Sequence, residues 1–192
     1  MSTPVESKPA VAPVLKGIVN VRESQLRLVT SVRLRWMAVL GQLAAVALIK
    51  LYYGFPFNIG NCLILIAMSA WLNVFLSIRY PARYRLSTSL AFGLLVYDVL
   101  QLAGLLYFTG GIQNPFSVLL VAPVTVAAAT QPMRYTFILG AIVIAVGGVL
   151  ISFHDPLPWY EGLRFELPRD YKVGSLTALV ASMIFMAFYT WR

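Results

Sequence analysis

The sequence predicts an all-α membrane protein: a bundle of six transmembrane helices with both termini cytoplasmic and a short amphipathic N-terminal helix. Of its 192 residues, 59% are hydrophobic and only 11% are charged, and the mean hydropathy is +0.78. Soluble domains carry about 25% charged residues, so this chain has too little charge to cover a globule in water. Lipid must therefore face much of its surface.

The first 35 residues are predicted to form a separate cytoplasmic segment. Residues 1–17 are rich in Pro, Ser and small side chains, a composition typical of disorder. Asn20 and Glu23 then have the spacing of a capping box, and apolar residues alternate with arginines at helical spacing from Val21 to Arg33. This pattern predicts a short interfacial helix on an anionic membrane surface. An ordinary frayed lead-in to the first span is an equally good alternative.

The remainder, residues 36–192, contains six apolar stretches that approach the length of about 20 residues needed to cross a bilayer core of about 30 Å. They are Trp36–Tyr53, Ile59–Ser77, Leu86–Phe108, Pro115–Thr130, Tyr135–Phe153 and Val173–Trp191. The fourth is the shortest, and we expect it to be thin or tilted. The stretches show no internal repeat that would support an inverted-repeat transporter.

The distribution of basic residues predicts the orientation. Eleven of the fifteen Lys and Arg residues lie at helix ends on the side of the N-terminus, and four lie on the other side. Because cytoplasmic loops carry the excess of Lys and Arg, both termini are expected in the cytoplasm. The first 35 residues contain no apolar core followed by a cleavage site, so the first span is expected to act as its own targeting signal.

Composition also argues against several classes of function. The net charge is +8, but the basic residues gather at the ends of apolar runs and not on one polar face, which argues against nucleic-acid binding. Cys62 is the single cysteine, so the sequence offers no intramolecular disulfide and no multi-cysteine metal site. His154 is the single histidine, so no pair of histidines is available to hold a haem. We expect no bound metal.

One string between the third and fourth spans carries the functional information. It reads Gly110-Gly111-Ile112-Gln113-Asn114-Pro115-Phe116. Gly110 and Gly111 can take positive φ and so end the third helix. Asn114 is a favoured N-cap and Pro115 a favoured first helical residue, so the fourth helix is predicted to begin there. A tight helical hairpin without any ligand is the simplest interpretation.

The chemistry of the string predicts more than a turn. Because Pro115 has no N–H, the free backbone donors at this helix start are predicted to belong to Phe116 and Ser117, at the positive end of the helix dipole. Gln113 and Asn114 add amides that donate and accept, while Tyr107 and Phe116 offer aromatic faces. A flat, lipid-soluble molecule with two carbonyl groups, such as a quinone, suits this surrounding.

The heptapeptide GGIQNPF resembles the quinone-binding signature of RegB/PrrB-type sensor histidine kinases, in which it lies in a short outer loop of a six-helix domain. The resemblance implies a homodimeric sensor in the bacterial inner membrane that reads the redox state of the ubiquinone pool. It further implies control of autophosphorylation on a cytoplasmic histidine, with phosphotransfer to a RegA/PrrA-type response regulator.

The chain departs from that family in one respect, because it stops at Arg192 and carries no H-box or ATP-binding segment. His154 falls in the predicted outer loop, away from ATP, and is not expected to be the phospho-acceptor. Cys62 does not inherit the redox role of the family's cytoplasmic cysteine. We therefore expect a sensor domain without its histidine kinase domain, and ATP binding only in that missing part.

Asp98 lies inside the third span, about 18 Å from the string. An ionisable side chain at that depth is costly and is by default a functional hypothesis. Gln101, Leu105 and Phe108 follow it at helical spacing, so they are expected to lie on one helix face that leads to the string. Asp98 and Gln101 are therefore candidates for coupling quinone chemistry to the bundle. Alternatively, Asp98 bonds a neighbouring amide, with Asn73 or Gln42 as its partner.

For the signal itself, the predicted donors favour the oxidised quinone, since a backbone N–H cannot accept a hydrogen bond from a quinol. Our hypothesis is that oxidised quinone stabilises the kinase-off arrangement and that the sixth helix relays the change. Three alternatives stand beside this interpretation: a small six-helix transporter or channel, a quinone-using membrane oxidoreductase, and a structural anchor that binds nothing.

Overall fold

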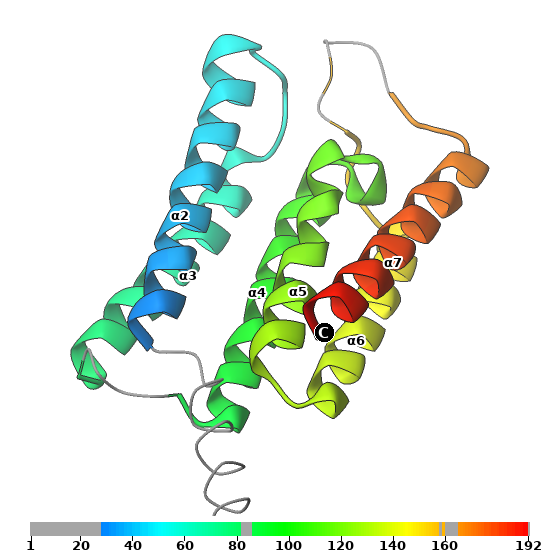
Figure 1. The fold of residues 1–192 in the computed structure, drawn as a ribbon. Coiled ribbons are helices and arrows are strands. Elements are labelled where there is room, and N and C mark those ends of the chain that lie inside the picture. Colours follow the sequence, from blue (N-terminus) through cyan, green and yellow to red (C-terminus); the bar gives the residue numbers. More distant parts are fainter. Residues whose placement is uncertain (1–27, 82–85, 158, 160–164, 192) are drawn as a thin grey trace, which may run out of the picture.

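The computed structural model describes residues 28–81, 86–157, 159 and 165–191. Within this part of the chain the secondary structure is helical, apart from one isolated bridge between Leu157 and Phe165 (Figure 1). The elements in chain order are α2 (Leu28–Ala47), η1 (Leu48–Tyr52), α3 (Ile59–Arg79), α4 (Thr88–Phe108), η2 (Gly111–Gln113), η3 (Pro115–Leu120), α5 (Val121–Thr130), α6 (Met133–Ser152) and α7 (Arg169–Trp191).

Five of these helical segments are long and apolar enough to cross a membrane, and Pro115–Thr130 forms a shorter apolar helix. The prediction of an all-helical membrane domain, with the fourth segment the shortest, is confirmed. That fourth segment starts as a 3-10 helix, which rises about 2.0 Å per residue where an α-helix rises about 1.5 Å. Its six 3-10 and ten α-helical residues therefore reach about 27 Å, close to the hydrocarbon thickness of about 30 Å.

The first helix runs without a break from Leu28 to Tyr52, with a π-helical last turn. Residues 28–35 are therefore helical and continuous with the predicted first span, as either interpretation of the lead-in allows. Leu28 is buried in a cluster with residues of α3 and α4, and Val32 packs against that cluster. This packing holds the first turns of α2 against α3 and α4. The predicted capping box at Asn20 lies outside the described residues.

The bundle has two parts. Helices α2 and α3 pack along each other as a hairpin, and α3 joins this hairpin to α4 (Figure 1). In the second part α5 packs on α7 and α4 on α6, around a core that includes Val99, Leu139 and Val143. The orientation of the two termini relative to the membrane stays a prediction.

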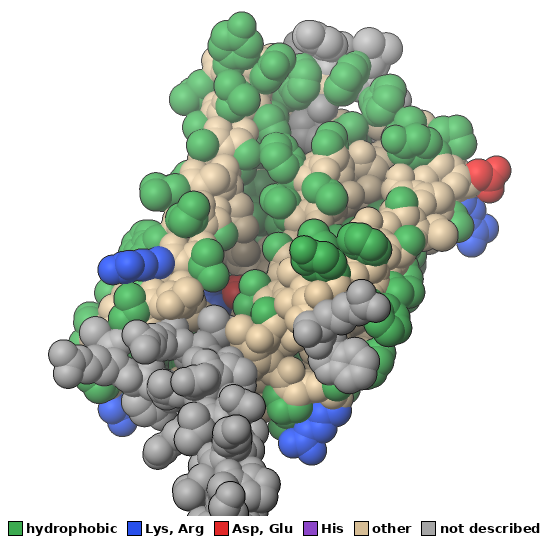
Figure 2. Space-filling view, in the orientation of Figure 1, with side chains coloured by type: hydrophobic (Ala, Val, Ile, Leu, Met, Phe, Trp, Pro, Cys, Tyr) green, Lys and Arg blue, Asp and Glu red, His purple; other side chains and the backbone are tan. Residues whose placement is uncertain are grey.

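The outside of the molecule is largely apolar (Figure 2). Large side chains on several helices are exposed, among them Leu51, Trp71, Ile78, Phe137 and Phe185. Lipid can cover such a surface and water cannot, because soluble proteins rarely expose apolar patches beyond a few hundred Å². The chain is a multi-pass membrane protein.

Candidate functional site

The GGIQNPF string folds as a double turn between α4 and η3. Gly110 has φ +109° and Gly111 has φ +64°, so both occupy backbone conformations that residues with a side chain rarely adopt. Asn114 is the N-cap of η3, with Pro115 at the first helical position. The predicted helix end at the glycines and helix start at Asn114 are both confirmed.

The side chain of Asn114 is the centre of a small hydrogen-bond network. Its Nδ2 donates to the backbone oxygen and to Oγ1 of Thr109, each at 2.9 Å, and its Oδ1 accepts from the backbone N–H of Phe116 at 2.9 Å. Thr109 Oγ1 in turn donates to the Leu105 carbonyl at 2.7 Å. Asn114 thereby ties the end of α4 to the start of η3.

This network corrects the prediction of free backbone donors. The N–H of Phe116 donates to Asn114 Oδ1, and the N–H of Ser117 donates to the Asn114 carbonyl at 2.9 Å. Asn readily forms such local side-chain bonds at helix starts, and here the cap uses the donors that were expected to meet a ligand. The redox preference inferred from free donors therefore loses its basis.

A groove of about 470 Å³ opens between α2, α4 and the η3–α5 segment, visible as a hollow in Figure 2. Its volume falls within the range of about 300–1,000 Å³ typical of ligand pockets. Thr109, Asn114 and Phe116 line one end, which we call the motif end. Arg35 and Asp98 lie toward the other, the ion-pair end, where the lining continues to Ser31, Leu86 and Ala91. The wall between them is mainly apolar and includes Val46, Leu102, Leu105, Leu106 and Leu119.

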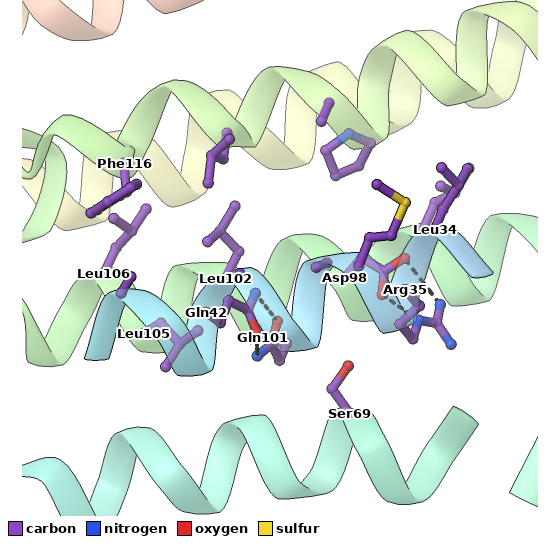
Figure 3. A pocket seen from close by; sticks show the side chains of 18 of the residues that line it. Leu34, Arg35, Gln42, Ser69, Asp98, Gln101, Leu102, Leu105, Leu106 and Phe116 are labelled. Carbon is purple, nitrogen blue, oxygen red and sulfur yellow. Dashed lines mark hydrogen bonds and ion pairs between the residues drawn. The ribbon is translucent and has the colours of Figure 1, made fainter. Parts of the chain in front are cut away.

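Asp98 and Arg35 form a two-point ion pair across the groove (Figure 3). Arg35 Nε lies 2.9 Å from Oδ1 and its Nη2 lies 3.0 Å from Oδ2. The Arg35 side chain is only 4% exposed and that of Asp98 is 32% exposed. Asp98 therefore pairs with a cation, and not with Asn73 or Gln42, the partners considered as an alternative. Arg35, which was interpreted as a topology signal, is buried inside the bundle.

A second polar pair lies between the two ends of the groove. Gln42 Nε2 donates to Gln101 Oε1 at 3.2 Å, and Gln101 Nε2 donates to Gln42 Oε1 at 3.0 Å (Figure 3). Asn73, the other expected partner of Asp98, instead donates to the Val32 carbonyl at 3.1 Å. Of the predicted helix face on α4, Asp98, Gln101 and Leu105 line the groove, whereas Phe108 does not.

Only two of the nine predicted quinone-binding residues, Asn114 and Phe116, line the groove. The other seven do not: Tyr107, Gly110, Gly111, Ile112, Gln113, Pro115 and Ser117. One reason is that η2 (Gly111–Gln113) packs against α6 and α7 and is buried there, away from the groove. Arg35, Gln42 and Thr109 line the groove and were missed by sequence reasoning.

The opposite side of the turn packs on the α6–α7 connection. Gln113 is buried, and its Oε1 accepts from the N–H of Leu167 at 2.9 Å. Near Gly111, the Nζ of the buried Lys172 lies 3.2 Å from His154 Nε2 and 3.0 Å from Glu166 Oε1. Within the described residues no three His, Cys, Asp or Glu side chains are grouped so as to hold a metal ion. These contacts fix the GGIQNPF string on the side that faces away from the groove.

Comparison with known proteins identifies the family of this chain. The family described as PilS-like transmembrane domain matches residues 23–189. Two proteins named Sensor histidine kinase RegB, both from Cereibacter sphaeroides and one of them from strain ATCC 17023, are 38% identical over 178 residues, which is 92% of this chain. The chain spans 38% of the length of these relatives. No solved structure gives a significant match.

The matched region runs through the described helices from α2 to α7 and contains the GGIQNPF string. The predicted resemblance to RegB-type sensor kinases is thereby confirmed. This chain belongs to the family of PilS-like transmembrane domains.

Proposed function

We propose that this chain is the membrane sensor domain of a two-component histidine kinase and that it binds ubiquinone in the groove between α2, α4 and α5. The observation that carries the proposal is the position of Asn114 and Phe116. They bring the quinone-associated string to one end of a groove whose walls are otherwise mainly apolar. Such a site suits ubiquinone, because its isoprenoid chain is apolar and its few polar atoms, the carbonyl and methoxy oxygens, all lie on the ring.

The rest of the proposal follows from the similarity to RegB-type kinases. The domain lies in the bacterial inner membrane as part of a homodimer, and α7 passes its state to a kinase domain that binds ATP and phosphorylates itself on histidine. The phosphoryl group then goes to a response regulator of the RegA/PrrA type. The groove separates the α2–α3 hairpin from the α4–α7 helices, so an occupant that fits one arrangement of these two parts better than another shifts their equilibrium.

Phe116 provides the sharpest test of the site, because this residue is 46% exposed and lines the groove. Phe116→Ala is expected to weaken binding of a short-chain ubiquinone to the chain in lipid nanodiscs by about tenfold, since an aromatic contact of this kind contributes about 1–1.5 kcal/mol. Equilibrium titration of the reconstituted protein measures the change. Asn114 is less suitable for this purpose, because its replacement also removes the cap of η3.

Phe137→Ala is the matched control. Phe137 lies on α6, is 67% exposed and does not line the groove, so its removal is expected to leave quinone affinity unchanged. Equal affinities for wild type, Phe116→Ala and Phe137→Ala would remove the string from the binding site.

A further inference from the structure

The motif end of the groove has little hydrogen-bonding capacity left for a ligand. Asn114 donates twice to Thr109 and accepts from Phe116, while the Thr109 hydroxyl donates to Leu105 and accepts from Asn114. A carbonyl oxygen placed there would meet no donor among these groups. The motif end therefore supplies shape and an aromatic face, and a quinone ring needs its donors elsewhere.

The Gln42–Gln101 pair does have spare capacity. A primary amide offers two N–H donors and two acceptor positions, and the reciprocal bonds use one of each on both side chains. Among the described residues, the structure gives neither amide a further partner, and both line the groove (Figure 3). This is the place in the groove where a carbonyl oxygen can accept an amide N–H.

The ion pair fixes the direction in which an elongated ligand would lie. Toward the ion-pair end the lining includes the charged side chains of Arg35 and Asp98. An isoprenoid chain would have to pass these charges before it reached the apolar lining beyond them, at Leu34, Leu86 and Ala91. In the other direction Leu102, Leu106 and Leu119 provide an apolar path to Phe116. The isoprenoid chain fits the second direction. Moving its apolar surface from water to an apolar wall is favourable, whereas covering charged groups with it leaves those groups without polar contacts.

From these contacts we infer that the ring of the quinone binds at the Gln42–Gln101 amide pair, while its isoprenoid chain leaves past Phe116. The ring site then lies about 12 Å from the motif end, the length of the eight residues of α4 from Gln101 to Thr109. This inference rests on the proposed function. It makes Gln42 of α2 a ligand-binding residue. The GGIQNPF string then contacts the isoprenoid chain of the quinone and not its ring.

Replacing both amides tests the ring site without leaving either amide unpaired. The double variant Gln42→Leu/Gln101→Leu replaces a reciprocal pair by apolar side chains of similar size, a change that is close to neutral for stability. It is expected to bind short-chain ubiquinone about tenfold more weakly than wild type, because a ring oxygen loses its donor. Gln131→Leu, outside the groove, serves as the control and should bind as wild type does. Wild-type affinity in the double variant would overturn the inference.

Photolabelling of the wild-type chain tests the orientation independently of any variant. A quinone with the azide on its ring is expected to label peptides containing Gln42 or Gln101. One with the azide at the far end of a short isoprenoid chain should label the peptide containing Phe116. The reverse pattern, or ring labelling at residues 109–116, would overturn the ring site but leave the proposed function intact. Absence of labelling in the groove with both probes would contradict the proposed function itself.

Discussion

Loss of Asp98 is expected to destabilise the bundle by about 3–5 kcal/mol, because the almost fully buried Arg35 is then left without its partner. Loss of Arg35 is expected to cost less, because the Asp98 side chain is 32% exposed. The pair links α2 to α4 across the groove, and Arg35 is almost fully buried. Arg35→Ala and Asp98→Ala should therefore each lower the free energy of unfolding in detergent. The exchange Arg35→Asp/Asp98→Arg should recover most of the loss, since it restores opposite charges at the same two positions.

Arg33→Ala is the control for these variants, because Arg33 lies on the same helix and is exposed. Its free energy of unfolding is expected to stay within about 0.5 kcal/mol of wild type. The structure would be contradicted if Arg35→Ala cost no more than Arg33→Ala, or if the charge exchange were as unstable as the worse single variant.

Gly111→Ala is expected to be strongly destabilising. Its φ of +64° costs a residue with a side chain about 1–2 kcal/mol. A Cβ there would also lie 2.5 Å from the Leu150 carbonyl oxygen and 2.7 Å from the His154 ring. Because one of these neighbours is backbone, the turn has to shift, and the total loss should exceed the strain of φ alone. Thermal unfolding of the variant measures the loss.

Gly54→Ala separates the two contributions. Gly54 also has positive φ, +66°, but an added Cβ would meet no atom within 4 Å. This variant should lose only the strain of about 1–2 kcal/mol, and the difference between Gly54→Ala and Gly111→Ala reports the steric overlap. Equal losses in the two would show that the contact of Gly111 with α6 is looser than described.

The helices could be predicted from the sequence because their signals are local. Apolar length gave the long spans, and Pro115–Thr130 was expected to be the shortest. The packing of the start of α2 was not predicted, because its arginines were interpreted as topology signals at a membrane surface. The burial of Leu28 and Arg35 depends on contacts with α3 and α4, and hydropathy along α2 does not contain that information.

Only those features of the candidate site that depend on residues close together in the sequence were predicted. The turn at Gly110 and the cap at Asn114 follow from local backbone chemistry, whereas the pairing of Arg35 with Asp98 joins residues 63 positions apart. A signal was nevertheless present. Arg35 and Gln42 are seven residues apart on α2, and Asp98 and Gln101 are three apart on α4, so each pair lies on one helix face. A polar face on each of two otherwise apolar helices indicates that α2 and α4 pack with these faces toward each other.

The occupancy of the groove is tested most directly by a structure of this chain in lipid nanodiscs with ubiquinone added. We predict density for the quinone between α2, α4 and the η3–α5 segment, in contact with Phe116. Quinone density confined to a surface that includes none of the groove residues, with only phospholipid between α2 and α4, would contradict the proposed quinone site.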